Sequence, residues 1–404
     1  MKTVDVIFPY RMSSTIGPVG TIKRIIKNHN YFKSNGFNIA VFSPSGTIIK
    51  PINESIQNKV NSSTKKINLK KKIKNLIPYS YSLSALYVYH IYIQRKFFVM
   101  KYLEKNRTPD IVVFHSLFEC YHYLKLRKNN SPRVILFQHS DCIPYKMEFI
   151  YFPKLKNKKF EKWLMNKYEF LVKNINKFAF ITKVGMDNFR KINTNIDYSC
   201  LALILNGIDD FNAKEKQFIE NYKQIKPFKY ELVVTGTISK RKGQDIIIEA
   251  LSILEDDILK DIHLTIIGDG NDKEKLEILT SKRGLEEHIT FLGKIDNSEV
   301  YKSLISKDIF ILMSENEGLP ISIIEAMRSS LAIITTKNSG MPEIVKNGYN
   351  GLLLERNSDA LLNIFKNIAS YNWKQMGLHS RIRFENELTF DRMKQDYLKM
   401  LIEI

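Results

Sequence analysis

The sequence predicts an α/β protein made of two doubly wound, Rossmann-like domains that face each other across a cleft. Short β-rich runs alternate with helical patterns along the 404 residues. Many of these runs are almost continuously apolar, which is typical of parallel strands that helices cover on both faces. Repeated βα units of this kind indicate open parallel sheets, and the chain is long enough for two of them.

The first domain is expected to span residues 1–205 and to contain five strands. Their segments read TVDVIFPY, FNIAVFSP, DIVVFHS, RVILFQHS and KFAFITK. The boundary is placed near Leu205, where LILNGIDDF introduces Asn-Gly turn chemistry before a polar stretch.

The second domain is expected at residues 206–385, followed by a C-terminal helix at 386–404. The strand segments of this domain read YELVVTG, IHLTIIGDG, HITFLG, DIFILMS and AIITTK. The last segment of the chain places five apolar residues along one helical face: Met393, Tyr397, Met400, Leu401 and Ile404. We expect this helix to close back on the N-terminal domain.

The positive charge of the chain is concentrated in its first half. The formal net charge is +20, with 35 Lys and Arg against 11 Asp and Glu in residues 1–205, a balance of +24. The remaining residues have 27 against 31, a balance of −4. A genomic bias toward lysine would act on both halves alike. The first half is therefore expected to face an anionic partner, which is a membrane surface, a phosphorylated acceptor or nucleic acid.

The sequence also indicates a cytoplasmic protein. The start, MKTVDVIFPYR, has no small-residue cleavage site typical of a signal peptide. The longest apolar-looking stretch, residues 83–93, is far shorter than the roughly 18 residues that a transmembrane helix needs. The three cysteines form no CxxC pair, which fits a reducing compartment and argues against a cysteine metal site.

Three glycine-containing loops follow strands in the second half, where open α/β sheets bind their ligands. In TGTISKRKGQD, Gly236 and Gly243 bracket Arg241 and Lys242, so backbone and cations together can approach a phosphate. IIGDGNDKEKLE turns at Gly268 and Gly270, and ITFLGKI offers backbone groups from Gly293 to Ile295 to the edge of a base. Each loop alone is a weak signal, since an exposed Lys-Arg turn is common, but the three occur together.

The stretch ENEGLPISIIEAM places two glutamates eight positions apart around an apolar run. Pro320 is suited to open a helix, because its missing N–H is among those that a helix start leaves unpaired. Glu317 is then expected in the loop before the helix and Glu325 on its second turn. The alternative is a solvated glutamate followed by an ordinary amphipathic helix.

These motifs together resemble glycosyltransferase family 4, also described as glycosyl transferases group 1. The segments TGTISKRKGQDIIIEAL, IIGDG, FLGKI, SENEGLPISIIEAM and SGMPEIVKNGYNGLLLE occur in the order and spacing of that family. The resemblance covers about residues 230–355. It implies the GT-B fold and a retaining enzyme that uses a nucleotide-diphosphate sugar as donor, with no further cofactor.

The resemblance also implies roles for individual residues. Glu325 would bind the ribose hydroxyls of the donor, because carboxylates accept paired hydrogen bonds from neighbouring hydroxyls. Glu317, with the backbone of Gly318 and Leu319, would hold the transferred sugar and its phosphate. Lys242 would neutralise the diphosphate as it departs.

Two positions depart from the family pattern. Thr237 stands where family members often have an arginine after the first glycine of the phosphate loop, and Arg241 is the candidate to replace it. Near the N-terminus, Val19 stands where the first of two adjacent glycines is common. Gly20, expected before a helix, remains to let backbone approach the donor phosphate.

His139 directly follows the strand segment RVILFQ, and the family often has a histidine there that contacts the donor sugar. A lone histidine is otherwise more often a structural residue. No protein nucleophile is assigned, since front-face attack assisted by the leaving phosphate is the usual proposal for the family. No DxD-type signature precedes the donor loops, so we expect a metal-independent enzyme with Lys242 and helix-terminal amides in place of a metal ion.

The segment TKKINLKKKIKNLIPYS has the pattern of a helix that lies on an anionic membrane. Four apolar residues share a helical face among lysines that include Lys70, Lys71, Lys72 and Lys74. Each lysine near an anionic membrane contributes about 1 kcal/mol of attraction. The alternative is a solvated surface loop.

We therefore expect a hexosyl- or N-acetylhexosaminyl-transferase, peripheral at the inner face of the cell membrane, that uses a UDP-sugar in polysaccharide or glycoconjugate synthesis. Its acceptor would be a glycan, a lipid-linked glycan or a polymer. The alternative is an inactive GT-B protein that binds another glycosyltransferase, for which Thr237 and Val19 are the indications. A nucleic-acid partner is not expected, because no recognised module accompanies the basic charge.

Overall fold

The computed structural model describes residues 1–10, 17–44, 46–48, 77–140, 144–156, 158–222, 226–296 and 298–404. The chain divides into two compact units. The first unit comprises Met1–Ile204 and Lys394–Ile404, and the second comprises Leu205–Met393. Lys70, Lys71, Lys72 and Lys74, expected from the sequence to contact a membrane or an acceptor, lie outside the described residues.

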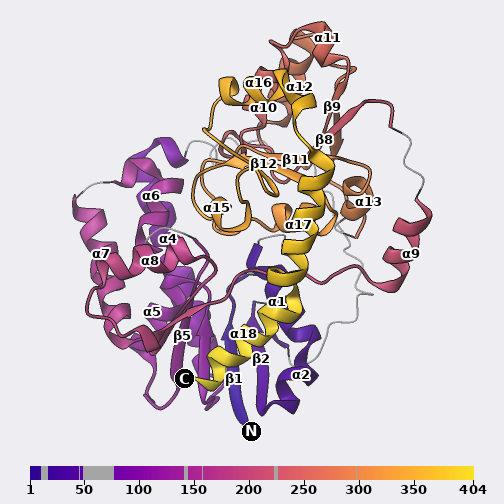
Figure 1. The fold of residues 1–404 in the computed structure, drawn as a ribbon. Coiled ribbons are helices and arrows are strands. Elements are labelled where there is room, and N and C mark those ends of the chain that lie inside the picture. The colour runs from indigo at the N-terminus through magenta and orange to yellow at the C-terminus, as the bar shows by residue number, and fades with distance from the viewer. Residues whose placement is uncertain are drawn as a thin grey trace. The chain divides into compact units, whose positions relative to one another are not determined.

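The first unit is a twisted sheet with helices on both faces (Figure 1). Within its described residues the sheet has seven strands in the order β3-β2-β1-β4-β5-β6-β7. All neighbouring strands are parallel except β3, which is antiparallel to β2. The strands are β1 (Lys2–Ile7), β2 (Phe37–Ser43), β3 (Gly46–Ile48), β4 (Ile111–Phe114), β5 (Arg133–Gln138), β6 (Lys177–Phe180) and β7 (Leu201–Leu203).

The helices of the first unit connect these strands. They are α1 (Gly17–Lys27), α2 (His29–Ser34), α4 (Tyr81–Leu103), α5 (Leu117–Leu126), α6 (Met147–Tyr151), α7 (Lys158–Asn174) and α8 (Lys183–Ile192). Alternate residues of a strand face opposite sides of a sheet. Leu136 of β5 packs in one core with Val88 and Val99 of α4, whereas the neighbouring Phe137 stacks on Tyr397 near the C-terminus. Helix α4 and the C-terminal helix therefore cover opposite faces.

The second unit is a smaller parallel sheet, also covered by helices. Its described residues form six strands in the order β10-β9-β8-β11-β12-β13. The strands are β8 (Tyr230–Thr235), β9 (Ile262–Ile267), β10 (Ile289–Gly293), β11 (Ile309–Leu312), β12 (Ala332–Thr336) and β13 (Gly351–Leu354). The helices are α9 (Ala213–Asn221), α10 (Gln244–Leu251), α11 (Asp256–Leu259), α12 (Lys273–Lys282), α13 (Val300–Leu304), α14 (Ile321–Arg328), α15 (Met341–Ile344), α16 (Ser358–Lys366) and α17 (Trp373–Glu387).

The strand order places one topological switch point in each sheet. In the first unit the order reverses between β1 and β4, and in the second it reverses between β8 and β11. Loops that leave two such strands diverge to opposite faces, which opens a crevice at the carboxyl edge of the sheet. The loops after β8 and β11 contain the Arg241–Lys242 and Glu317 motifs, so the fold brings these two motifs to the same edge.

All ten strands expected from the sequence are present. The sequence did not predict β3, β7 and β13, each of which has three or four residues. Runs this short carry little alternation or composition bias, and these three lack the phenylalanines that mark the similarly short β4, β6 and β11. The antiparallel edge strand β3 also differs from the expected parallel arrangement.

The C-terminal helix α18 (Phe390–Ile402) ends in the first unit, as the sequence predicts. The side chains of Met393, Tyr397, Met400 and Leu401 are all buried. The Tyr397 ring lies 5.6 Å from the Phe137 ring, in a stacked arrangement. Ile404 lies beyond the helix end and is only partly buried.

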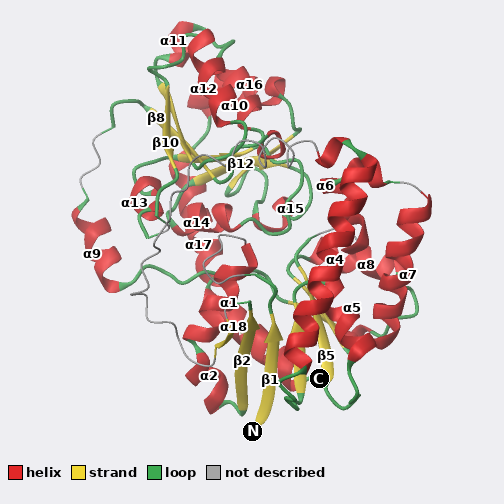
Figure 2. Ribbon diagram, turned by 180° about the vertical axis from the view of Figure 1, so that it is seen from behind, coloured by secondary structure: helices red, strands yellow, loops and turns green. Residues whose placement is uncertain are grey.

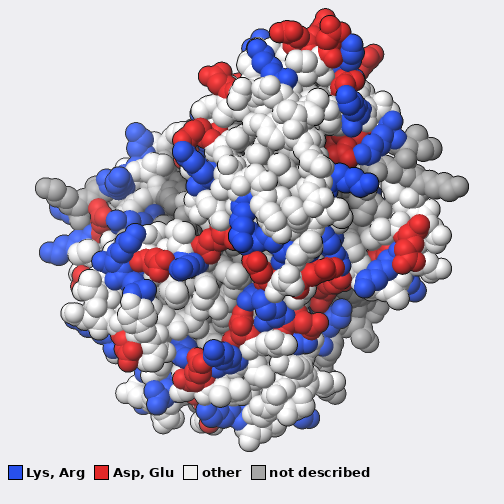
Figure 3. Space-filling model, viewed as in Figure 1, with Lys and Arg blue, Asp and Glu red and all other residues white. Residues whose placement is uncertain are grey.

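The described residues include no helix that is long and apolar enough to cross a membrane. On the face drawn in Figure 3, Lys and Arg side chains are interspersed with Asp and Glu side chains. On that face the described residues therefore do not gather the charge excess of the first half into one uniform patch.

Candidate functional site

The loop after β8 presents two cations at the carboxyl edge of the second sheet. It passes from Gly236 through a short 3-10 helix, Lys240–Lys242, into α10. A Cβ at Gly236 would lie 4.0 Å from Lys242 Nζ, so the backbone here is open toward that ammonium group. This is the arrangement expected where a phosphate approaches backbone and cation together.

Two other glycines of the motifs allow close contact between loops. A Cβ at Gly268 would lie 1.8 Å from the Gly236 carbonyl oxygen, and a Cβ at Gly243 would lie 2.2 Å from the Met313 carbonyl oxygen. Real side chains do not fit at such distances, and both glycines have positive φ, +146° and +73°. The sequence suggested these glycines for contact with a ligand, but the structure shows that each first serves to pack one strand-end loop against another.

Buried Gln244 fixes the loop that contains Thr237. Its side-chain amide donates a hydrogen bond to the Thr237 carbonyl at 3.1 Å, and its Oε1 accepts one from the Ser239 N–H at 3.3 Å. The exposed Thr237 side chain takes no part in these contacts. Thr237, which stands where the family often has an arginine, is therefore held in place through its backbone carbonyl.

Glu317 joins the two loops of the switch point. Its Oε1 lies 2.6 Å from Lys242 Nζ and 2.7 Å from Arg241 Nη1, and it accepts a hydrogen bond from Ser314 Oγ at 2.8 Å. Burial alone would raise the pKa of Glu317, but the charges of Lys242 and Arg241 and the hydrogen bonds outweigh it and lower the pKa. Glu317 is therefore ionised at neutral pH and holds both cations.

Backbone contacts fasten the same two loops together. Arg241 Nη1 donates to the Asn316 carbonyl at 2.7 Å, and the Glu315 N–H donates to the Arg241 carbonyl at 2.8 Å. Arg241 is thus tied to the Glu317 loop, which limits how far it can replace the family arginine. The Lys242 side chain binds Glu317 and lies beside Gly236, where it is the better placed of the two cations to meet a phosphate.

The Glu-Gly-Leu-Pro turn leads directly into α14. The sequence suggested that Pro320 opens the helix from its first turn. In the structure Pro320 is instead the N-cap residue and has an extended backbone. Asn206 Nδ2 donates to the Leu319 carbonyl at 3.0 Å, and the Gly340 N–H donates to the Glu317 carbonyl at 3.3 Å. Half-buried Glu325 lies on the second turn of α14, as predicted.

The third loop is fixed to the second. The Gly268 N–H donates to the Gly293 carbonyl at 2.8 Å, so that carbonyl is already paired within the fold. Ile295 follows two residues later and is half-buried. Of the backbone groups suggested for a base, those beyond Gly293 are the better candidates.

In the first unit, His139 is paired with a second histidine. His115 follows β4 and His139 follows β5, and His115 Nδ1 lies 2.8 Å from His139 Nε2. Burial lowers the pKa of His139 to about 4, and burial followed by the proximity of His139 lowers that of His115 well below its usual value. Both imidazoles are neutral at physiological pH, and a single hydrogen lies between the two nitrogens.

Arg95 of α4 holds the loop after β1 against α5 in the same unit. Its Nε lies 2.8 Å from fully buried Glu119 Oε1, and its Nη1 donates to the Pro9 carbonyl at 2.9 Å.

Helix α1 begins at Gly17, so Gly20 lies in its first turn. The expectation that Gly20 precedes the helix is wrong, because the helix starts three residues earlier.

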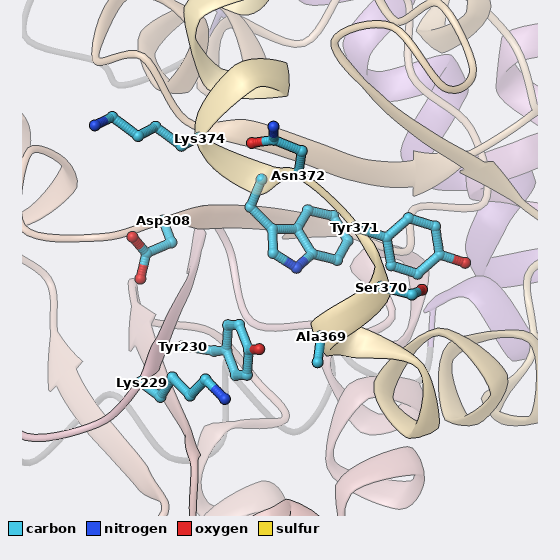
Figure 4. A pocket seen from close by; sticks show the side chains of 9 residues that line it. Lys229, Tyr230, Asp308, Ala369, Ser370, Tyr371, Asn372 and Lys374 are labelled. Carbon is cyan, nitrogen blue, oxygen red and sulfur yellow. The ribbon is translucent and has the colours of Figure 1, made fainter.

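The second unit also has a shallow hollow of about 440 Å³ that is not part of this site (Figure 4). Tyr230 at the start of β8, Asp308 before β11, Tyr371 and Trp373 contribute to its lining. Tyr230 and Asp308 mark the amino ends of two strands, whereas Lys242 and Glu317 follow the carboxyl ends. In the described part of the chain, no three His, Cys, Asp or Glu side chains are arranged to hold a metal ion.

Residues 215–370 match the family Glycosyl transferases group 1. The matched region contains both loops of the Lys242–Glu317 cluster and the close-packed loop at Gly268. The chain contains a group 1 glycosyltransferase domain.

Curated relatives match this chain over part of their length. A glycosyltransferase of Methanocaldococcus jannaschii is 30% identical over 192 residues, which are 46% of this chain and 48% of that protein. The amylovoran biosynthesis glycosyltransferase AmsK of Erwinia amylovora is 29% identical over 128 residues, 30% of this chain and 31% of that protein. The chain therefore matches less than half the length of either relative.

The structure of HepE from Anabaena, in complex with UDP-glucose, aligns over 100% of both chains with a TM-score of 0.64. The identity is 13%, so this likeness concerns the fold. The group 1 glycosyltransferase domain and the first unit together have the GT-B fold.

Three residues that contact predicted site residues were not identified from the sequence. His115 follows a strand segment directly, as His139 does, so the same signal was available in DIVVFHS. Ser314 and Asn206 gave no sequence signal, because their importance depends on contacts with Glu317 and Leu319 that only the folded second unit creates.

Proposed function

We propose that this protein is a retaining glycosyltransferase that moves a hexose or N-acetylhexosamine from a UDP-sugar to a hydroxyl of a glycan, lipid-linked or polymeric acceptor. The observation that carries the proposal is the convergence of Lys242 and Arg241 on Glu317 at the switch point of the second sheet. The amylovoran relative supports polysaccharide or glycoconjugate synthesis, and the UDP-glucose complex of HepE supports the donor class.

The two cations suit a diphosphate leaving group. Lys242 is largely buried, and charges act more strongly on one another where water is excluded. Lys242 would contact the diphosphate beside Gly236, while Glu317 and the backbone of Gly318 and Leu319 would hold the transferred sugar. Glu325, one turn into α14, would accept hydrogen bonds from the ribose hydroxyls.

The proposed step needs no protein nucleophile. The acceptor oxygen attacks the anomeric carbon on the face from which the diphosphate leaves, and the bond between that carbon and the phosphate oxygen breaks. The electron pair of that bond remains on the diphosphate, which takes the proton of the acceptor hydroxyl. Lys242 stabilises the negative charge that develops. From the first unit we assign His139, kept neutral by burial, to the transferred sugar.

A pair of lysine variants tests the proposal. Lys240 is exposed and lies in the same 3-10 helix as Lys242, so Lys240→Met is the matched control for Lys242→Met. After thermal-shift screening of UDP-, GDP- and ADP-sugars, turnover of the labelled donor is measured. We expect Lys242→Met to lower kcat/KM by about 100-fold, the usual loss of one transition-state contact, and Lys240→Met to leave it nearly unchanged.

Equal activity of the two variants would contradict the assignment of Lys242. A wild-type protein that binds a UDP-sugar but never transfers or hydrolyses it would favour the alternative, an inactive GT-B protein that serves another glycosyltransferase.

A further inference from the structure

Helix α4 exposes an apolar stripe on the surface of the first unit. Leu86, Tyr89, Ile93, Phe97 and Met100 recur every three or four residues and so lie on one side of the helix. The exposed fractions of Leu86, Tyr89, Phe97 and Met100 are 67%, 55%, 58% and 37%, and Ile93 is half-buried. A helix with apolar residues on every side is normally buried all round, but α4 is not. We call these five residues the α4 stripe.

The opposite side of α4 attaches the helix to its unit. Val88, Val99 and Tyr102 are buried there, and the Tyr102 hydroxyl donates to Asp5 at 2.7 Å. Arg95, on the same side, binds Glu119. Figure 2 shows α4 in front of the strands of the first sheet, on the outside of the unit. The α4 stripe is therefore not needed to hold the helix in place.

The charges around the α4 stripe identify the kind of surface that it fits. Helix α4 has no Asp or Glu, and its first charged residue is Arg95. Lys96 and Lys101 flank the C-terminal half of the stripe, where their long stems can cover apolar surface while the ammonium groups stay in water. Exposed tyrosine, phenylalanine and leucine beside lysine are typical of helices that lie in the interface of a bilayer.

Two occupants are possible for such a face, an anionic bilayer or a second copy of the chain. The first half of the chain has a net charge of +24, so two copies that meet at this face would repel each other, whereas anionic lipid would attract them. We infer that the α4 stripe is the surface through which the first unit docks on an anionic lipid bilayer, with its apolar side chains inserted among the headgroups. This inference does not depend on the proposed catalytic function.

Vesicle co-sedimentation of the full chain tests the inference. The vesicles are phosphatidylcholine alone, or phosphatidylcholine with about one third phosphatidylglycerol. The stripe variant is Leu86→Gln with Phe97→Gln. Its matched control is Ile253→Gln with Ile278→Gln, because both isoleucines are 51% exposed and lie in the second unit. We expect wild type and control to bind anionic vesicles alike, and the stripe variant to partition at least about tenfold less.

A second readout reports insertion itself. The tryptophan emission of the Leu86→Trp variant should shift to shorter wavelength on anionic vesicles and be quenched by brominated lipid chains. Equal binding of wild type and stripe variant, equal wild-type binding to neutral and anionic vesicles, or an unshifted emission of the Leu86→Trp variant would each overturn the inference. So would a stripe variant that loses self-association in sedimentation velocity while its vesicle binding is unchanged. Turnover with a soluble acceptor should be normal in the stripe variant, so that failure of docking and failure of the proposed catalysis are distinguished.

Discussion

Lys242 forms an ion pair with Glu317 across the switch point of the second sheet, with Nζ 2.6 Å from Oε1. The two residues are 75 positions apart in the chain and come from loops that follow β8 and β11. Glu317 keeps Lys242 in place beside Gly236 before any donor arrives, so little reorganisation is needed when a diphosphate binds. The same carboxylate is a negative charge close to the position proposed for that diphosphate.

Replacement of Glu317 should therefore separate binding from turnover. In Glu317→Gln the negative charge is lost while Lys242 and Arg241 remain, so UDP should bind as tightly as to wild type or several-fold more tightly. Turnover of the UDP-sugar should fall by about tenfold or more, because the hydrogen bonds to the transferred sugar are weakened. Titration calorimetry with UDP and a steady-state assay measure the two effects. Weaker UDP binding with unchanged turnover would exclude the assigned role of Glu317.

Replacement of Glu325 should have the opposite effect. Loss of a charged hydrogen-bond acceptor for the ribose should weaken donor binding by about 1.5–3 kcal/mol in Glu325→Ala. Glu315 is exposed and precedes the same turn, so Glu315→Ala is the control and should bind UDP like wild type. Calorimetry of both variants decides the matter, and unchanged UDP affinity in Glu325→Ala would show that the nucleotide lies elsewhere.

The lowered pKa of Glu317 predicts a pH-dependent contribution to stability. A carboxylate with a lower pKa in the folded chain stabilises the fold at pH values above its unfolded pKa of about 4.3, and this effect is lost as the pH falls through the lowered folded value. The unfolding free energy of Glu317→Gln should thus be lower than that of wild type by about 1–3 kcal/mol near neutral pH. This difference in unfolding free energy between wild type and variant should shrink as the pH falls below about 4.3, the pKa of the carboxyl group in the unfolded chain. Urea unfolding of the isolated proteins at a series of pH values measures this difference. A difference that widens in acid would contradict a stabilising role of the Glu317 ion pairs.

Activity should survive chelation of divalent ions. Lys242, Arg241 and the backbone near Gly236 supply positive charge where the diphosphate is proposed to bind, so the protein itself can neutralise the leaving group. The initial rate of transfer is compared before and after treatment with EDTA. Complete loss of activity that Mg²⁺ or Mn²⁺ restores would show that a metal ion performs this task.

The lysine run near residue 70 should contribute attraction to anionic vesicles. Changing Lys70, Lys71, Lys72 and Lys74 to Gln should remove several kcal/mol of surface attraction, at about 1 kcal/mol for each lysine. High salt should weaken wild-type binding in the same way, because exposed charges more than about 8–10 Å apart are screened. Co-sedimentation compares the variant with wild type. Equal binding would leave this run as a solvated segment without a role at the membrane.

Much of the fold follows from local patterns. The ten expected strands are buried apolar runs, and burial on both faces of a parallel sheet demands such runs wherever the strand is long enough. The face of α18 was predictable because Tyr397, Met400 and Leu401 recur with helical spacing. The positions of Glu317 in a loop and Glu325 on a second helical turn followed from Pro320, which marks a helix start within a few residues.

The pairing of side chains from distant loops was not predictable. Arg241, Lys242 and Glu317 were each identified from motifs, but their convergence depends on β8 and β11 being neighbours in the sheet. Likewise His115 pairs with His139 because β4 lies beside β5. Strand order cannot be inferred from local sequence patterns, because it depends on how all the βα units pack together.

By itself, the sequence determined ten of the strands, the division into two α/β domains, and which residues carry charge near strand ends, because hydrophobic periodicity and turn chemistry act over a few residues. Only the tertiary structure decided that Gly268 and Gly243 serve close loop contacts, that Glu317 holds two cations, and that α4 leaves Leu86 and Phe97 exposed. Apolar residues lie on every side of helix α4, so its periodicity cannot distinguish the buried face from the exposed one. That distinction arises when one side packs on the sheet and the other finds no neighbour in the described part of its own unit.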